Sequence, residues 1–506
     1  MSEPADPTRR NLIALLLGAA AVPLLAQGGQ AAAPGSSPLP PQRPTAGKPV
    51  ALAVAPPADA LIAAAQLGGA VGYVVADART GTVLEAVGAA QVLPPASVAK
   101  AMTTLYALDA LGPAFRFDTR VIATGSVAGG VVQGDLILAG SGDPTLATDD
   151  LASMARALQA KGVTGITGHF LVWGGALPQI DRIDRDQPDH VGYNPAISGL
   201  NLNFNRVHFE WRKTGADYAV SMEARSDSYR VAVAMARMRV VNRQAPLYTY
   251  AGAEGRDDWT VARPALGTSG SRWLPVRRPA LYTGQAFQAL AAAHGIALPV
   301  AKVATALPQG TVLVRHTSAD LTTILRDMLK YSTNMTAEVV GRTASRALGS
   351  GVTTLAASAA AMNRWLAETQ GVRTAAFVDH SGLGGDTRIA PGDLVTALLR
   401  PAGKAGLRGL MKQFPLVDAK GHDMADPPVR ITAKTGTLNF VSGLAGFATT
   451  EGGTDLAFAI LCADVARRDR VPVAEREQPE GGKAWSKRAR RLQQALIERW
   501  SGLYGG

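Results

Sequence analysis

The sequence contains one cysteine among its 506 residues. Cys462 therefore cannot form an internal disulfide, and its place in the apolar run 456–463 favours a buried small side chain over a reactive thiol. Histidine is also scarce, with seven residues in the chain. These histidines never occur as an i, i+4 pair and have no neighbouring carboxylates in a metal-ligand pattern. We therefore expect neither a disulfide-stapled fold nor a metal site.

The apolar run near the N-terminus, residues 12–26, is too short to cross a bilayer comfortably. It follows Arg9 and Arg10 and leads into three alanines at 31–33, which is the layout of a cleaved secretory signal. The paired arginines favour twin-arginine export, with the Sec route as the alternative. The sequence thus predicts a signal peptide over 1–33, a Pro- and Ala-rich linker over 34–57 and a periplasmic location.

Acidic residues are the minority, with 40 Asp and Glu against 51 Lys and Arg, and the formal net charge is +11. The predicted signal peptide adds nothing to this excess, because Arg9 and Arg10 balance Glu3 and Asp6. A basic exported protein suits anionic surfaces such as cell-wall polymer or lipid headgroups. Nucleic acid suits the same charge, but the sequence has no zinc-finger spacing and no interleaved aromatic and basic residues, so we expect no nucleic-acid partner.

A serine and a lysine stand three positions apart at the start of a predicted helix. Ser97 and Lys100 follow Pro94-Pro95 and precede an apolar repeat that ends at Gly112-Pro113. On a helix this spacing puts both side chains on one face, about one turn apart, so the amine can reach the hydroxyl. The pair is a candidate nucleophile and base, although a helix cap beside a surface lysine gives the same pattern by chance.

Two further motifs follow along the chain. Ser332 and Asn334 form a Ser-x-Asn in the turn between two predicted helices, where such residues could simply cap the second helix. Lys434-Thr435-Gly436 lies in a predicted strand over 429–437. A second Lys-Thr-Gly at 213–215 occupies the turn of a predicted hairpin, where glycine and polar residues are favoured for local reasons. We therefore assign the function to Lys434.

The remaining chain predicts a mixture of helices and short strands. A hairpin, 69–76 and 83–87, precedes the Ser97 helix, and the C-terminus reads as an amphipathic helix with Trp485 and Trp500 on its apolar side. Packing on a sheet is the favoured use of that side, and weak membrane-surface contact is the alternative. Between residues 115 and 305 we expect helices over 149–161 and 282–294 and strands over 168–173, 200–209, 218–223 and 229–238.

The three motifs in this order resemble those of the penicillin-recognising serine hydrolases and acyltransferases. Ser332 follows Ser97 by 235 residues, a much longer interval than a compact class A β-lactamase has, so a large insertion must separate the first two motifs. This arrangement resembles the low-molecular-mass class C penicillin-binding proteins, the D-alanyl-D-alanine carboxypeptidase/endopeptidase family (penicillin-binding protein 4 type). Segments 142–146, 200–205 and 379–383 are similar to that family as well.

The resemblance implies an α+β fold. We expect a transpeptidase-like domain of the penicillin-binding/β-lactamase type, an antiparallel sheet with helices on both faces, interrupted by a large β-rich insertion. The catalytic domain is placed at 58–115 and 306–506, and the inserted accessory region, with room for two subdomains, at 116–305.

The resemblance also implies a serine carboxypeptidase that acts on peptidoglycan peptides ending in D-alanyl-D-alanine, acts as an endopeptidase and is acylated by β-lactam antibiotics. Ser97 would attack the carbonyl of the penultimate D-alanine, and Lys100 would accept its proton. Lys434 would supply the cation that, together with burial, keeps Lys100 partly neutral. Ser332 would relay the proton to the leaving amine, and Asn334 would hold Lys100 and bind the substrate amide.

The third motif would bind the end of the peptide. By the resemblance, Lys434 and Thr435 receive the terminal carboxylate, and Gly436 lets the substrate approach as an added strand. The oxyanion would be held by the backbone N–H groups of Ser97 and Thr437. No cofactor is implied.

Two other classes stay open on the sequence alone. A β-lactamase or related serine esterase shares all three motifs, and a non-catalytic wall-binding scaffold would use the insertion and the positive charge. A class A β-lactamase places a dedicated glutamate between its second and third motifs, whereas here that interval holds only Glu338 and Glu368, which both look structural. We therefore expect a penicilloyl-enzyme that persists and a peptide acyl-enzyme that hydrolyses.

Overall fold

The computed structural model describes residues 55–505, apart from residues 254 and 419. The predicted signal peptide and most of the predicted linker therefore lie outside the described residues. Within the described ranges, no helix has the length and apolar character needed to cross a membrane.

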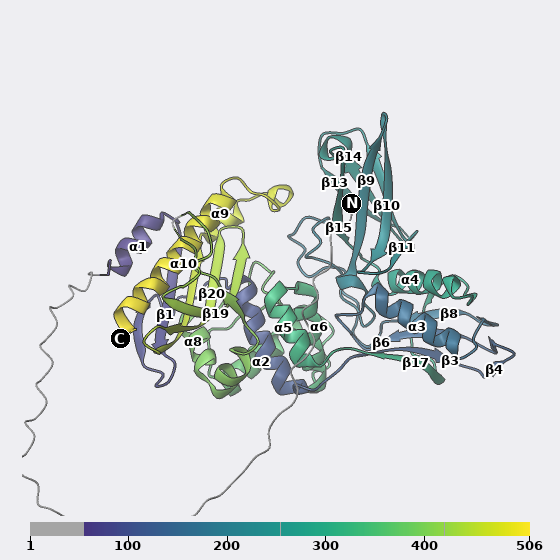
Figure 1. Cartoon of the computed structure of the whole chain (residues 1–506), viewed down its shortest axis with the longest axis horizontal. Helices are drawn as coiled ribbons and strands as arrows, with labels where there is room; N and C mark the ends of the chain where they lie inside the picture. The colour runs from purple at the N-terminus through teal and green to yellow at the C-terminus, as the bar shows by residue number, and fades with distance from the viewer. Residues whose placement is uncertain (1–54, 254, 419, 506) are drawn as a thin grey trace, which may run out of the picture. The chain divides into compact units, whose positions relative to one another are not determined.

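A six-stranded antiparallel sheet forms the centre of the catalytic part (Figure 1), in the order β18-β19-β20-β21-β1-β2. The central strands β20 and β21 are buried almost throughout, as expected for strands covered on both faces. Cys462 lies fully buried in β21, as predicted. The strands are β1 Ala70–Asp77, β2 Val83–Val87, β18 Lys412–Phe414, β19 Val429–Leu438, β20 Val441–Thr450 and β21 Asp455–Ala463.

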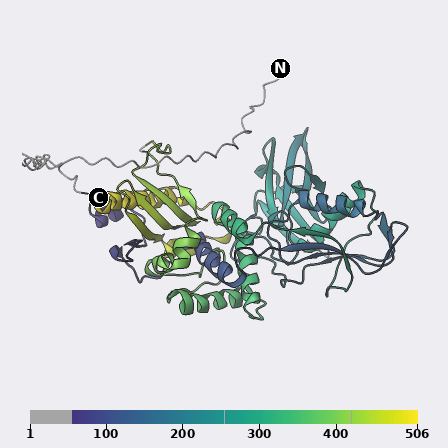
Figure 2. The ribbon, with the colours of Figure 1, turned by 60° about the horizontal axis from the view of Figure 1, so that its bottom comes forward.

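One face of this sheet is covered by the C-terminal helix α10 Gly482–Tyr504, beside which α1 Ala58–Ala65 packs. Figure 2 shows α10, in yellow, lying along the sheet. The apolar side of α10 recurs at near-helical spacing and is buried in the same cluster as the side chains of β19, β20 and β21. The predicted use of this side is thus confirmed. Its buried members include Trp485, Ala489, Leu492, Leu496 and Trp500.

The opposite face carries a group of helices that come from both sides of the insertion. They are α2 Ala99–Leu111, α5 Leu321–Tyr331, α6 Asn334–Ala347, α7 Leu355–Trp365 and α8 Pro391–Leu399. The apolar side chains of α2 and α5 belong to one core cluster, although about 200 residues separate the two helices. This shared core brings the first and second motifs together.

The inserted region builds its own sheets and its own core. A five-stranded sheet has the order β16-β8-β6-β3-β17 and packs with helices α3 Thr148–Ala160 and α4 Pro279–Ala293. Its strands are β3 Asp118–Ala123, β6 Leu136–Gly140, β8 Phe170–Trp173, β16 Lys302–Val303 and β17 Thr311–Thr317. A second sheet holds β9 Arg206–Thr214, β10 Asp217–Arg225, β11 Arg230–Ala232 and β15 Ser269–Pro275, and a third holds β12 Ala236–Val241, β13 Tyr248–Ala253 and β14 Arg256–Ala262.

Three local predictions need correction. The strand expected over 200–209 begins only at Arg206, because Asn203, Phe204 and Asn205 adopt positive φ angles and the Asn205 side chain bonds the backbone of Leu202 and Ala196. The strand expected over 229–238 is divided between β11 and β12. Strand β17 pairs with β3 in the accessory sheet, so the return to the catalytic part lies near residue 318 and not at 306.

Candidate active site

Ser97 lies in a 3-10 turn, Ala96–Val98, that runs directly into α2. The regular helix therefore begins two residues after the serine and not at it. The expected geometry of the pair is nevertheless present, because Lys100 Nζ donates to Ser97 Oγ over 3.0 Å. Lys100 is fully buried, whereas Ser97 is half-buried, so the serine can meet a substrate while its partner lysine is kept from bulk water.

Lys100 has two further acceptors within the site. Its Nζ donates to Asn334 Oδ1 and to the backbone carbonyl of Ser381, each over 2.7 Å. Together with Ser97 Oγ, these acceptors match the three N–H groups of an ammonium. Asn334 thus holds Lys100 as the resemblance implied, whereas Ser381 was named only as part of a similar segment.

Burial lowers the pKa of Lys100 to about 8, while the buried carboxyl groups of Asp379 and Glu338 act in the opposite direction. Of the two causes that we expected, burial and the charge of Lys434, burial is the main one. The two amines do repel each other's protons, and burial and Lys100 hold the pKa of Lys434 well below its usual range. A fraction of Lys100 is therefore neutral near physiological pH.

A buried carboxylate pair that the sequence did not reveal lies beneath Lys100. Glu338 accepts the backbone N–H groups of His380 (3.0 Å) and Ser381 (2.8 Å), and burial raises its pKa. Asp379 accepts those of Gly382 (2.7 Å) and Gly384 (2.6 Å). These bonds fix the loop whose carbonyl holds Lys100. The available signal was a glutamate directly before Val339 and Val340 on helix α6, since a carboxylate that becomes buried must be paired.

The second motif occupies the turn between α5 and α6, as predicted. Ser332 is the left-handed residue that ends α5, with φ of 59°, and Asn334 is the first residue of α6. The Asn334 amide also donates through Nδ2 to the backbone carbonyl of Tyr193, over 2.9 Å. Tyr193 lies in the predicted insertion, so a residue of that segment helps to orient the Asn334 side chain, which sequence patterns did not indicate.

Lys434 projects from β19 into the same site. It is 2% exposed and donates to Ser332 Oγ over 2.9 Å and to the backbone carbonyl of Thr435 over 2.7 Å. The other Lys-Thr-Gly behaves as predicted: Lys213 is exposed near the end of β9, and Gly215 has a positive φ of 61° in the turn before β10. The structure therefore brings only one of the two tripeptides to Ser97.

Gly436 allows β19 to approach the nucleophile turn. A Cβ atom at this position would lie 2.4 Å from the carbonyl oxygen of Pro95 and 3.0 Å from the backbone nitrogen of Ser97. Such contacts are too close for any side chain. The missing side chain at Gly436 therefore makes room for the turn that carries Ser97.

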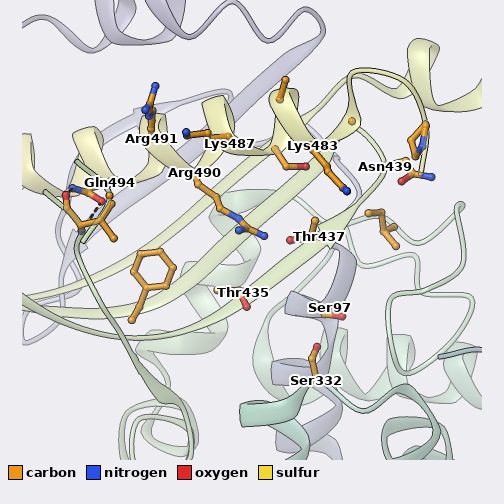
Figure 3. A pocket seen from close by; sticks show the side chains of 18 of the residues that line it. Ser97, Ser332, Thr435, Thr437, Asn439, Lys483, Lys487, Arg490, Arg491 and Gln494 are labelled. Atoms are coloured by element: carbon orange, nitrogen blue, oxygen red, sulfur yellow. Dashed lines mark hydrogen bonds between the residues drawn. The ribbon is translucent and has the colours of Figure 1, made fainter. Parts of the chain in front are cut away.

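The remaining side chains of the motifs line one hollow of about 2170 Å³. Ser97, Ser332, Asn334, Thr435 and Thr437 are among its lining residues, and Figure 3 shows four of them below helix α10. Among the described residues, no cluster of three or more His, Cys, Asp or Glu side chains is arranged to hold a metal ion.

Comparisons with known proteins agree with this geometry. Residues 56–479 match the D-Ala-D-Ala carboxypeptidase 3 (S13) family. A D-alanyl-D-alanine carboxypeptidase from an Actinomadura species is 29% identical over 487 residues, covering 84% of this chain and 86% of the relative. A D-alanyl-D-alanine carboxypeptidase from Haemophilus influenzae is 25% identical over 422 residues, covering 77% and 85%.

The fold has a solved counterpart. The crystal structure of penicillin binding protein 4 from Haemophilus influenzae superposes with a TM-score of 0.70 at 19% identity, covering 87% of this chain and 99% of that one. This likeness confirms the predicted α+β fold class. Because the family match extends from residue 56 to residue 479, this chain belongs to the D-Ala-D-Ala carboxypeptidase 3 (S13) family.

Proposed function

We propose that this D-Ala-D-Ala carboxypeptidase uses Ser97 as its acylated nucleophile and Lys100 as the base that activates it. The observation that carries the proposal is the 3.0 Å contact between the buried Lys100 Nζ and Ser97 Oγ, which lines the hollow. A serine hydroxyl is a weak nucleophile until an adjacent base takes its proton. Burial lets Lys100 act as that base, because it lowers the pKa of the amine to about 8.

In the acylation step, Ser97 Oγ forms a bond to the carbonyl carbon of the penultimate D-alanine, and its proton passes to Lys100. The backbone N–H groups of Ser97 and Thr437 stabilise the oxyanion. The C–N bond then breaks, and Lys100 gives the proton through Ser332 to the leaving amine. Lys434 holds Ser332 by a 2.9 Å hydrogen bond. Terminal D-alanine departs. Water then attacks the carbonyl carbon of the serine ester and passes a proton to Lys100. The bond from that carbon to Ser97 Oγ breaks, Lys100 returns the proton to Oγ, and the shortened peptide is released.

Lys434 and Thr435 receive the terminal carboxylate of the peptide. The amine of Lys434 is almost fully buried, so its attraction for a carboxylate is little screened by water. Thr435 and Thr437 both line the hollow that contains Ser97. Asn334 binds two partners, the substrate amide and the amine of Lys100.

We further propose that the substrates are peptidoglycan stem peptides, that cross-linked peptides are cleaved as well, and that β-lactams acylate Ser97. A structure of the Haemophilus influenzae penicillin binding protein 4 complexed with a β-lactam, at a TM-score of 0.68 and 20% identity, supports the last point. We place the enzyme in the periplasm, where such substrates lie, with export through the twin-arginine route that Arg9 and Arg10 specify. Replacing both arginines with lysine keeps the charge, so unchanged export of that variant would favour the Sec route instead.

Two measurements on one preparation test the activity. We expect D-alanine to be released from a muramyl-pentapeptide, while penicillin absorbance falls only in proportion to enzyme. The reason is that Glu338, the glutamate in helix α6, is buried and already accepts backbone N–H groups of His380 and Ser381, so it does not present a base to water. Rapid loss of penicillin with negligible D-alanine release would instead identify a β-lactamase.

A further inference from the structure

The free edge of β19 ends within the active site. Strand β18 begins at Lys412, which pairs with Ala433, so the edge of β19 is already occupied up to the residue before Lys434. Under the proposed function, the scissile carbonyl lies at Ser97 and the terminal carboxylate lies at Lys434. The part of the substrate that leaves after cleavage therefore extends along β19 from Thr437 toward Lys434. Any group attached beyond a terminal D-alanine would meet Lys412.

Lys412 is exposed and lies close enough to Lys434 to help lower the pKa of that amine. No hydrogen bond or ion pair holds the Lys412 side chain among the residues that the structure describes. Two cations placed together without a carboxylate between them repel each other. The fold gains nothing from this arrangement, so the charge of Lys412 is available to an anion that enters the hollow.

Helix α10 adds a second cationic wall to the same hollow. Lys483, Lys487 and Arg490 are exposed, and their side chains likewise have no hydrogen-bond or ion-pair partner within the described part of the chain. Figure 3 shows Arg490 extending from α10 toward the strand that carries Thr435 and Thr437, whereas Arg491 points away from it. Like charges four residues apart, as at Lys483 and Lys487, weaken a helix slightly.

The size and charge of the hollow exceed what a terminal D-alanine requires. Its volume of about 2170 Å³ is larger than the roughly 300–1,000 Å³ of ordinary small-molecule sites. Eight lysines and arginines line it against three carboxylates. One of these carboxylates, Glu477, is already paired with His190 and Arg272. The hollow is therefore suited to a larger ligand that carries negative charge.

We propose that Lys412 and Arg490 bind the carboxylates of a second peptide, attached on the leaving-group side of the scissile bond as it is in a cross-link between two stem peptides. The inference rests on the proposed function and deepens it. A peptide is favoured over a lipid headgroup because the two cations line the same hollow as Ser97. Their ligand can therefore be the peptide that is joined, through the scissile bond, to the peptide that Ser97 attacks. An arginine presents a planar fork of N–H donors that fits a carboxylate.

The test compares two substrates of one enzyme. The first is a monomeric pentapeptide that releases D-alanine, and the second is a cross-linked dimer whose leaving peptide carries free carboxylates. For the double variant K412Q/R490Q we expect the ratio of kcat/KM for dimer to kcat/KM for monomer to fall about tenfold or more. The monomer serves as the internal reference for any effect on Ser97 itself. The charge-preserving variant K412R/R490K should retain most of the wild-type ratio.

Two controls isolate the carboxylates. The variant K161Q/K213Q also removes two positive charges, both exposed and outside the hollow, and should leave the ratio within about twofold of wild type. A dimer whose leaving peptide is amidated at every carboxyl except the one that Lys434 receives removes the anions instead of the cations. The wild type should cleave this dimer as slowly as K412Q/R490Q cleaves the acidic one, because either change breaks the same ion pairs.

Several results would overturn the inference. They are equal cleavage of acidic and amidated dimers by the wild type, an unchanged ratio in K412Q/R490Q, and no dimer cleavage by an enzyme that releases D-alanine. Loss of binding to phosphatidylglycerol vesicles in K412Q/R490Q with an unchanged ratio would assign the cations to a lipid surface. A wild type that neither releases D-alanine nor takes up penicillin would overturn the proposed function itself, and the inference with it.

Discussion

Lys434 Nζ donates to Ser332 Oγ over 2.9 Å, although the two residues are 102 positions apart in the chain. Lys100 makes the corresponding contact to Asn334 Oδ1 over 2.7 Å, across 234 positions. The turn that carries the second motif therefore lies between the lysines of the first and third motifs. Burial and the nearby charge of Lys100 together hold the pKa of Lys434 well below its usual range.

Ser97→Ala should abolish covalent labelling by penicillin. The reason is that Ser97 Oγ accepts a hydrogen bond from Lys100, the buried lysine that follows it by one turn. Intact-mass analysis after incubation with a penicillin should show one adduct on the wild type and none on the variant. An equal thermal midpoint for both proteins would confirm that the variant is folded. A label that survives in the alanine variant would show that another residue is acylated.

Lys434→Ala should lower the rate of D-alanine release by about 100-fold or more, because it removes the cation that receives the carboxylate and holds Ser332. The matched change Lys213→Ala alters the same tripeptide in an exposed hairpin turn and should keep the rate within about twofold. Steady-state kinetics on a pentapeptide would measure both. Comparable losses from the two variants would contradict the assignment of the third motif.

The rate of acylation by penicillin should rise with pH, with a midpoint near 8. Burial disfavours the charged form of Lys100 and so lowers its pKa from 10.5 to about 8, and only the neutral amine above that value can accept the serine proton. Lys100→Arg should remove nearly all acylation, because a guanidinium stays protonated. Stopped acylation assays across the pH range would measure the profile. A rate that falls with rising pH through 8 would argue against Lys100 as the base.

Glu338→Gln should move that midpoint toward lower pH. The carboxylate of Glu338 raises the pKa of Lys100, so its removal leaves the effect of burial less opposed. The matched change Glu368→Gln removes an exposed carboxylate and should leave the midpoint in place. The pH profile distinguishes this electrostatic role from a loss of stability, which would lower the rate at every pH. A midpoint that moves upward would contradict the sign of the effect.

Gly436→Ala should slow acylation by about 100-fold or more, because the new Cβ would lie 2.4 Å from the Pro95 carbonyl and displace the turn that carries Ser97. Gly215→Ala is the matched change in the other tripeptide. Its Cβ meets no atom within 4 Å, although its positive φ costs about 1 kcal/mol of stability. Acylation by Gly215→Ala should stay near the wild-type rate. Retained acylation in Gly436→Ala would show that the strand can shift away.

Features with local causes followed directly from the sequence. The spacing of Ser97 and Lys100 placed them on one face because a helical turn repeats after a few residues, whichever fold surrounds it. The turn of the second motif, the hairpin at Lys213 and the buried face of α10 were predicted for the same reason. The strand expected over 200–209 was wrong at its start because asparagine side chains can bond the backbone and stabilise a left-handed turn.

Tertiary structure alone decided how the motifs act together. The sequence determined which residues are present and which lie one turn apart, but the depth at which Lys100 is buried depends on α2, α6 and the loop 379–384 packing around it. The pKa of an amine follows its loss of water and its nearby charges, which here come from Glu338 and Asp379, more than 200 residues along the chain. No local pattern records such distances, so the base was predictable as a residue and its pKa only as a consequence of the fold.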